Sequence, residues 1–208
     1  TGKINKLLIL HSHFDHVGIV PYFKRTYPDI EIYASAPGWK ILTMPRAIET
    51  VNSFSELVAR HMNAAEKLDA YDHLWRDDIS GTTVGEGDVI DLGGVSLTVM
   101  ATPGHSSCSI SAYEPTLEAL FASDAVGIPY KDTYFPSGNS DFTLYQKNLE
   151  RLNALNVKYV CADHYGYVTG DEAATYVDAT IKEAGRFRAQ MEELYRTHGD
   201  VDGAAKAV

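Results

Sequence analysis

The segment HSHFDH occupies residues 11–16 and directly follows the apolar run KINKLLIL of residues 3–10. A short apolar run bounded by polar residues is typical of a strand that is buried on both faces. Side chains alternate along an extended chain, so His11 and His13 point the same way, and Asp15 and His16 face the same pocket once the chain turns. The segment therefore predicts a strand that ends in a cluster of nitrogen and oxygen donors.

Three further candidate donors follow predicted strands later in the chain, in the segments TPGHS, LFASDAVG and CADHYG: His105, Asp124 and His164. Imidazole nitrogen and carboxylate oxygen are the ligands that suit zinc or iron, and a loop at a strand end can hold them rigidly. The isolated histidines are expected to be hydrogen-bonded structural residues instead: His61, His73 and His198. The sequence thus predicts one metal site built from three distant segments.

Periodicity predicts the elements that connect these segments. Helices are expected over residues 17–27, 142–155 and 171–197, and strands over 30–34, 89–92, 95–101, 108–113, 119–122 and 157–161. Residues 127–141 are expected to form a loop. Apolar residues at helical spacing from Val51 to Trp75 predict a helical insertion, over residues 46–77, broken once. We expect one α/β domain over residues 1–208, with two mixed sheets covered by helices and a helical extension over residues 171–208.

Composition excludes several classes of partner. Eighteen Lys and Arg against 28 Asp and Glu give a formal charge of −10, which repels phosphate backbones, so nucleic acid is not expected as a partner. No apolar run approaches the length of a membrane span, and no signal-peptide pattern is recognisable, so a cytoplasmic protein is expected. Cys108 and Cys161 are expected to be packed thiols rather than a disulfide framework.

The ordered donors resemble the metallo-β-lactamase-fold superfamily over nearly the whole chain. The resemblance implies an αβ/βα sandwich of two mixed sheets around two divalent metal ions, zinc being expected first and iron or manganese being alternatives. It implies that the first metal is bound by His11, His13 and His105. It implies that the second is bound by Asp15, His16 and His164, and that the carboxylate of Asp124 bridges the two.

Such a pair of metals shares a water that becomes hydroxide near neutral pH, so no Ser or Cys nucleophile is required. The chain looks most like the thioesterase and glyoxalase II-like branches, which implies hydrolysis of a small-molecule thioester or ester by the bridging hydroxide. Asp15 is expected to be the catalytic proton acceptor. Aromatic residues near the predicted site are expected to bind substrate: Tyr130, Tyr134, Phe135 and Tyr165.

A second hypothesis is a diiron protein that binds or reduces O₂ or NO. Flavodiiron proteins share the fold, and the segment around Asp124 is similar to theirs, although they usually have Glu where this chain has His13. A ligand-binding regulator with vestigial chemistry has little support, because no ligand is missing.

Members of the superfamily normally have several strands before the HxHxDH motif, whereas ten residues precede it here. We therefore expect N-terminal strands to be missing, so that the first sheet has an open apolar edge. The sequence is then a fragment, or a second chain completes the sheet. The apolar stripe of the insertion is expected to be a lid or to be buried in a homodimer.

Overall fold

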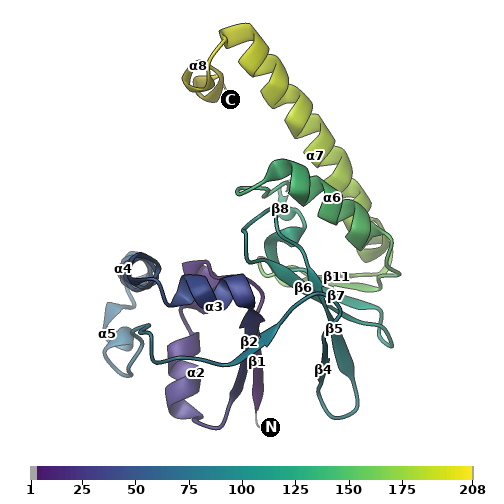
Figure 1. Cartoon of the computed structure of the whole chain (residues 1–208). Helices are drawn as coiled ribbons and strands as arrows, with labels where there is room; N and C mark the ends of the chain where they lie inside the picture. Colours follow the sequence, from purple (N-terminus) through teal and green to yellow (C-terminus); the bar gives the residue numbers. More distant parts are fainter. Residues whose placement is uncertain (1–3, 208) are drawn as a thin grey trace.

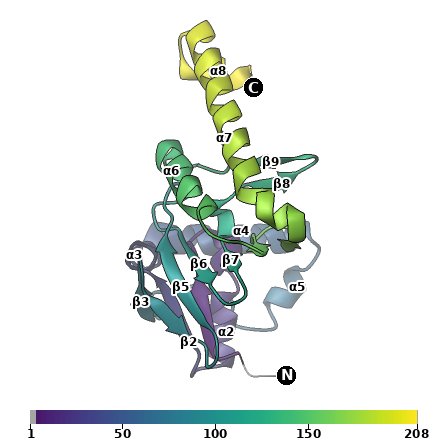
Figure 2. The ribbon, with the colours of Figure 1, turned by 90° about the vertical axis from the view of Figure 1, so that its right-hand side faces the viewer.

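Two β-sheets pack face to face in the computed structural model of the chain, which describes residues 4–207, and helices cover their outer sides (Figures 1 and 2). Side chains of both sheets meet between them: Leu8 and Tyr33 of the first sheet pack on a cluster that includes Val99 and Ile110 of the second. The expected α/β sandwich is therefore confirmed.

The first sheet contains three parallel strands in the order β1-β2-β3: β1 (Lys6–Ile9), β2 (Glu31–Ser35) and β3 (Thr82–Val84). Parallel neighbours need a crossover connection, which is helical here: α1 (Phe14–Val17) and α2 (Val20–Thr26), and then α3 (Ala36–Leu42), α4 (Pro45–His61) and α5 (Ala65–Leu68). Among the described residues β1 pairs only with β2, so its other edge is open, as expected.

The second sheet is mixed, with the strand order β11-β10-β7-β6-β5-β4. Its strands are β4 (Val89–Asp91), β5 (Ser96–Ala101), β6 (Ile110–Glu114), β7 (Ala119–Phe121), β10 (Tyr159–Cys161) and β11 (Tyr167–Thr169). Strands β7 and β10 are parallel, and their connection contains the 3₁₀ turn η1 (Ser123–Ala125), the hairpin β8 (Ile128–Tyr130) and β9 (Thr133–Phe135), and helix α6 (Phe142–Asn153). Helix α6 packs with α7 (Gly170–His198) over a core cluster that includes Leu120 and Leu149.

The C-terminal extension has the expected helical form. Helix α7 begins on the second sheet, its far half projects beyond the body of the molecule, and α8 (Val201–Lys206) folds back beside its end (Figure 1). Within residues 4–207, no helix combines the length and the apolarity that crossing a bilayer requires. Both cysteines are free, Cys108 buried and Cys161 partly buried.

Several boundaries differ from the sequence-based prediction. The helix expected over residues 17–27 is divided into α1 and α2, and the loop expected over residues 127–141 contains the hairpin β8–β9. Other short elements were also not predicted: α3, β3, η1 and β11. The helical insertion expected over residues 46–77 is broken once, between α4 and the short α5, and its helical part ends at Leu68 rather than near Trp75. Trp75 is nevertheless almost fully buried in a core cluster that includes Ile32 and Leu42. Its indole Nε1 donates to the carbonyl of Leu42 at 3.0 Å, and Asn52 bonds its backbone.

Candidate metal centre

The first loop of the site leaves β1 and turns into α1. His11 and His13 lie in the extended segment between these elements, and His13 is the N-cap of α1 (φ −69°, ψ 148°). Asp15 and His16 follow on α1 itself, so the turn into the helix brings them round to the same side as the two histidines. A strand followed at once by a helix therefore concentrates four donors within six residues.

The second loop joins β5 to β6 and carries His105. The preceding residue, Gly104, has φ +139°, and a Cβ atom placed there would lie 2.5 Å from Cα and N of Tyr145 on α6. Only glycine fits this close approach. The backbone N–H groups of Ser140 and Asp141 donate to the Gly104 carbonyl at 2.9 Å. The loop is thus fixed against α6, and His105 is buried and fixed with it.

The third part of the site comes from the ends of β7 and β10. These strands are parallel neighbours in which Phe121 pairs with Cys161, so their carboxyl ends lie at the same edge of the sheet. Asp124 lies in η1, directly beyond β7, and His164 lies in the turn between β10 and β11. The topology therefore brings a carboxylate and an imidazole together from residues 40 positions apart.

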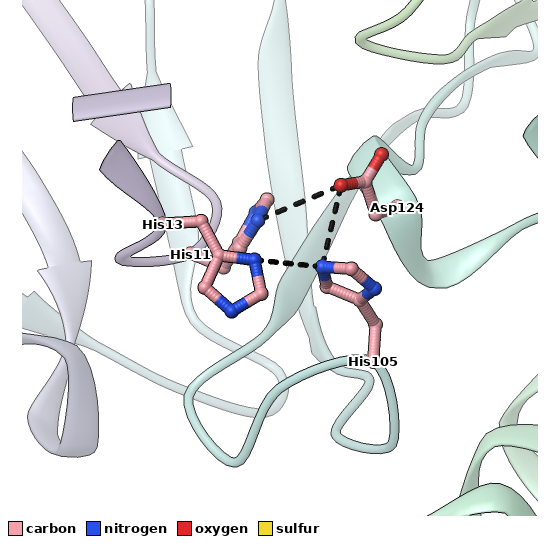
Figure 3. Close-up of side chains that lie close together, drawn as sticks. All are labelled: His11, His13, His105 and Asp124. Carbon is pink, nitrogen blue, oxygen red and sulfur yellow. Dashed lines mark hydrogen bonds and ion pairs between the residues drawn. The ribbon is translucent and has the colours of Figure 1, made fainter. Parts of the chain in front are cut away.

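The Asp124 carboxylate is the meeting point of the cluster (Figure 3). Its Oδ2 lies 3.3 Å from Nε2 of His16, 3.3 Å from Nε2 of His105 and 3.6 Å from Nε2 of His11. Its other oxygen, Oδ1, lies 3.4 Å from Nε2 of His164. A carboxylate placed between histidines in this way can contact two cations at once.

Three groups of donors have ligand atoms that all lie within 4.8 Å of one another. One of them combines His11 and His16 with Asp163, which was not predicted as a ligand, and the other two consist of predicted ligands. Of these two, the first comprises His11, His13, His105 and Asp124, and the second comprises Asp15, His16 and His164. These are the two sets that the family resemblance implied, with Asp124 reaching both through its contacts with His16 and His164. The structure thus brings all seven predicted ligands together.

Outer hydrogen bonds orient the imidazoles. Nδ1 of His11 bonds Ser123 Oγ at 3.0 Å, and Nδ1 of His105 bonds the carbonyl of Ser137 at 2.7 Å. Nδ1 of His16 lies 2.9 Å from Oδ2 of Asp163. A histidine that donates one ring N–H to such a partner presents the other nitrogen as a lone pair, the usual arrangement of a metal ligand. Nε2 of His11, His16 and His105 therefore faces the interior of the cluster.

The hydrogen bonding of the Nε2 atoms of His11 and His16 shows whether the cluster fits a cation. Nε2 of His11 and Nε2 of His16 are buried and have no hydrogen-bond partner. A buried polar atom without a partner is costly, so proteins rarely retain one without a reason. A divalent ion among the seven donors would satisfy both atoms, and imidazole with carboxylate is a donor set that such ions accept. The residues present fit a metal centre.

The electrostatics of the cluster agree with this fit. Burial lowers the pKa of His11 to about 3, so this imidazole is neutral at pH 7. The neighbouring imidazole of His16 lowers the pKa of Asp15 to about 2. Burial disfavours the charged form of His16, but the neighbouring carboxylates of Asp124, Asp15 and Asp163 outweigh it and raise its pKa to about 11. The carboxylates hold a positive charge at His16, in the position where a cation would replace the proton.

A cavity of about 700 Å³ adjoins the cluster, and three candidate ligands line it: His13, Asp15 and His105. The remaining lining comes from α1, α3, α4 and the residues between α3 and α4, and from three serine-containing loops. This volume is typical of a small-molecule site. The ligand cluster therefore opens directly into a pocket that can hold a substrate.

The aromatic residues predicted to bind substrate lie elsewhere. None of the four is among the residues that line this cavity. Tyr134 packs on Tyr176 with ring centroids 4.3 Å apart, and Phe135 packs near Phe187 of α7, whereas Tyr130 is exposed. Tyr165 is also exposed, but its ring centroid lies 6.5 Å from that of His164. A role in substrate binding stays a prediction, and the cavity wall is built from other residues.

Sequence reasoning did not identify Asp163 and Ser123 as part of the site. Ser123 donates to the Asp163 carboxylate and also bonds His11, so one carboxylate supports two histidines. Each residue directly precedes a predicted ligand, His164 and Asp124 respectively. That adjacency was the available signal, but sequence neighbours of a ligand point in many directions and only the fold selects these two.

Comparisons with known proteins agree with the fold. The sequence profile of the metallo-beta-lactamase superfamily matches residues 2–164. The hydroxyacylglutathione hydrolase of Rhodopseudomonas palustris is 30% identical over 202 residues, covering 90% of this chain and 62% of that protein. The atrochrysone carboxyl ACP thioesterase of Aspergillus fumigatus is 22% identical, covering 98% of this chain and 53% of that protein. The chain thus spans a little over half the length of these relatives.

A solved structure has the same fold. The metallo-beta-lactamase superfamily protein ST1585 from Sulfolobus tokodaii superposes with a TM-score of 0.67 at 23% sequence identity, covering 88% of this chain and 68% of that one. At this identity the likeness establishes the architecture only.

Proposed function

This chain belongs to the metallo-beta-lactamase superfamily, and from that premise we propose that it is a metal-dependent hydrolase of thioesters or esters. The observation that supports this most is the cluster centred on Asp124, which opens into a cavity of about 700 Å³. The names of two relatives, a thioesterase and a hydroxyacylglutathione hydrolase, favour release of an acyl group from a thiol over cleavage of a phosphodiester.

Two divalent cations, one in each ligand group, would supply a water of lowered pKa and a positive charge that polarises the scissile carbonyl. We assign His11, His13 and His105 to one cation, Asp15, His16 and His164 to the other, and Asp124 to both. Zinc is our first choice, with iron or manganese as alternatives.

Asp15 is proposed to transfer protons in addition to binding a cation. Its side chain is 41% exposed, it lines the cavity, and Oδ2 lies 3.4 Å from Nε2 of His16 and 3.8 Å from Nε2 of His164. It can therefore reach a water or substrate in the cavity while it remains fixed by the two histidines. We assign Asp15 to accept the proton of the attacking water and to return it to the leaving group.

The test is an assay of protein reconstituted separately with zinc, iron and manganese on acyl thioesters, esters, lactones and phosphodiesters. Hydrolysis of thioesters or esters that Asp124→Ala abolishes is the expected result. Activity on phosphodiesters alone, or none on any substrate, contradicts the proposal. The visible spectrum gives a second outcome, because an iron chromophore that reacts with O₂ or NO favours the diiron alternative over a hydrolase.

A further inference from the structure

Helix α4 and the residues before it give the cavity a mostly apolar wall, which also contains Arg46 and Thr50. Ile41 at the end of α3, Met44 before α4, and Ala47 and Val51 on α4 all line it, together with Phe14 of α1. Residues 44, 47 and 51 are spaced by three and four positions, so they lie on one face at the start of the helix. The same cavity is lined by His13, Asp15 and His105. The carbonyl of a thioester or ester carries an acyl chain on one side and a thiol or alcohol part on the other. When this carbonyl lies at the ligand cluster, one of these two parts therefore contacts the wall.

The apolar side chains of the wall favour contact with the acyl chain over contact with the thiol part. The thiol parts of biological thioesters, such as glutathione or a pantetheine arm, carry amides and charged groups, and burying these against apolar side chains without partners is costly. An aliphatic acyl chain has no such groups and gains free energy for each CH₂ that leaves water. The polar lining residues Ser106, Ser107 and Asn139 lie on other segments of the cavity, whereas Arg46 and Thr50 lie on α4 next to the apolar residues of the wall.

We propose that α4 forms an acyl-binding wall, so that the preferred substrates are thioesters or esters of extended aliphatic acids rather than of small polar acids. This proposal rests on the proposed hydrolase function and names its substrate class. The acyl chain extends from the ligand cluster along Met44, Ala47 and Val51, and the polar leaving group remains outside this wall. An acyl group as small and polar as a hydroxypropionyl group leaves the wall in contact with water.

A larger side chain at position 47 is expected to shorten the part of the wall that is open to an acyl chain. It lies on the cavity-facing side of α4 between Met44 and Val51, and its side chain is the smallest of the three. A leucine at this position adds three carbon atoms to the wall and occupies the path of a long chain, while the ligand cluster keeps its own contacts. Ala189 on α7 is an exposed helical alanine outside the cavity lining, so Ala189→Leu is a matched control.

The first experiment measures kcat/KM of the metal-loaded protein on thioesters of one common thiol, from acetyl to decanoyl. We expect kcat/KM to rise about threefold to fourfold for each added CH₂ until the chain fills the wall. Ala47→Leu is expected to lower the decanoyl-to-acetyl ratio about tenfold or more, Ala47→Val to lower it less, and Ala189→Leu to leave it unchanged. Hydrolysis with no dependence on chain length, or a ratio that neither Ala47 variant changes, overturns the proposal.

The second experiment does not depend on turnover. Calorimetric titration of the same proteins with decanoate and with acetate measures the wall alone, and burial of the chain predicts a negative heat-capacity change for decanoate. Ala47→Leu is expected to weaken decanoate binding about tenfold and acetate binding little. Equal decanoate affinity in the wild-type protein and both Ala47 variants overturns the acyl wall. Absence of all hydrolysis with this binding pattern intact rejects the hydrolase function and keeps the wall.

Discussion

Nδ1 of His16 lies 2.9 Å from Oδ2 of Asp163, and the same carboxylate accepts a hydrogen bond from Ser123, whose hydroxyl also bonds Nδ1 of His11. Asp163 follows β10 of the second sheet, and the two imidazoles that it orients, those of His11 and His16, follow β1 of the first sheet. The hydrogen bonds set which nitrogen each ring presents to the cluster.

Replacing Asp163 by alanine is expected to weaken metal binding about 10-fold to 100-fold, because His16 loses its acceptor and the Ser123 hydroxyl loses its partner. Competition titration with a chromophoric chelator measures this affinity. Asp178→Ala removes an exposed carboxylate of α7 that pairs with Lys182, and it is expected to leave the affinity unchanged. Equal metal affinity in Asp163→Ala and the wild-type protein would show that this carboxylate does not support the site.

Gly104→Ala is expected to destabilise the protein by about 2 kcal/mol or more, because the new Cβ meets the α6 backbone 2.5 Å away at a positive φ. The matched control is Gly185→Ala within α7, where a Cβ meets nothing within 4 Å. This change is expected to stabilise by about 0.5–1 kcal/mol, since alanine favours the helix. Urea unfolding measures both, and a Gly104→Ala protein as stable as the wild type contradicts the packing described for the His105 loop.

Leu149→Ala is expected to lower the free energy of unfolding by about 2–5 kcal/mol. Leu149 is fully buried in the cluster that joins α6 and α7 to the second sheet. Leu144 lies on the same helix but is 36% exposed, and Leu144→Ala is expected to cost less than about 1 kcal/mol. Denaturant titrations of the two variants side by side measure the difference, and similar losses would mean that α6 is packed differently.

Removal of metal is expected to lower the thermal midpoint. Ions that bind the folded chain at about 1,000 times their dissociation constant stabilise it by about 4 kcal/mol, which corresponds to roughly 8–16 °C for a chain of this size. Differential scanning fluorimetry with and without a chelator measures the shift. Asp124→Ala is expected to remove most of it, whereas an identical midpoint with and without chelator argues against a bound ion.

The site was predictable because its residue types are dense in the sequence and each segment follows a strand. The HSHFDH segment needs only the alternation of side chains and one turn to converge, and the structure places Asp15 and His16 on the helix that makes that turn. Asp163 was not predictable in this way, because its role comes from the pairing of β7 with β10, which brings it to Ser123.

The same distinction applies to the fold. Long periodic segments such as α6 and α7 were located correctly. The apolar spacing continues past α5 to Trp75, but residues 69–81 are not helical, and Trp75 is buried instead by packing in the core cluster of the first sheet, where it is hydrogen-bonded to Leu42 and Asn52. The hairpin β8–β9 lacks the usual Asn-Gly or Asp-Gly turn, and its positive φ is at Lys131, so turn chemistry gave no signal. Short elements of this kind depend on tertiary contacts.

The most direct test of the central claim is the number of metal ions bound per chain, measured by inductively coupled plasma mass spectrometry after the protein is equilibrated with zinc and separated from free ions. The two ligand groups around Asp124 predict two ions per chain in the wild-type protein and a clear loss of bound metal in Asp124→Ala. A folded wild-type chain that retains no metal, or an Asp124→Ala chain that retains the full complement, would contradict the account.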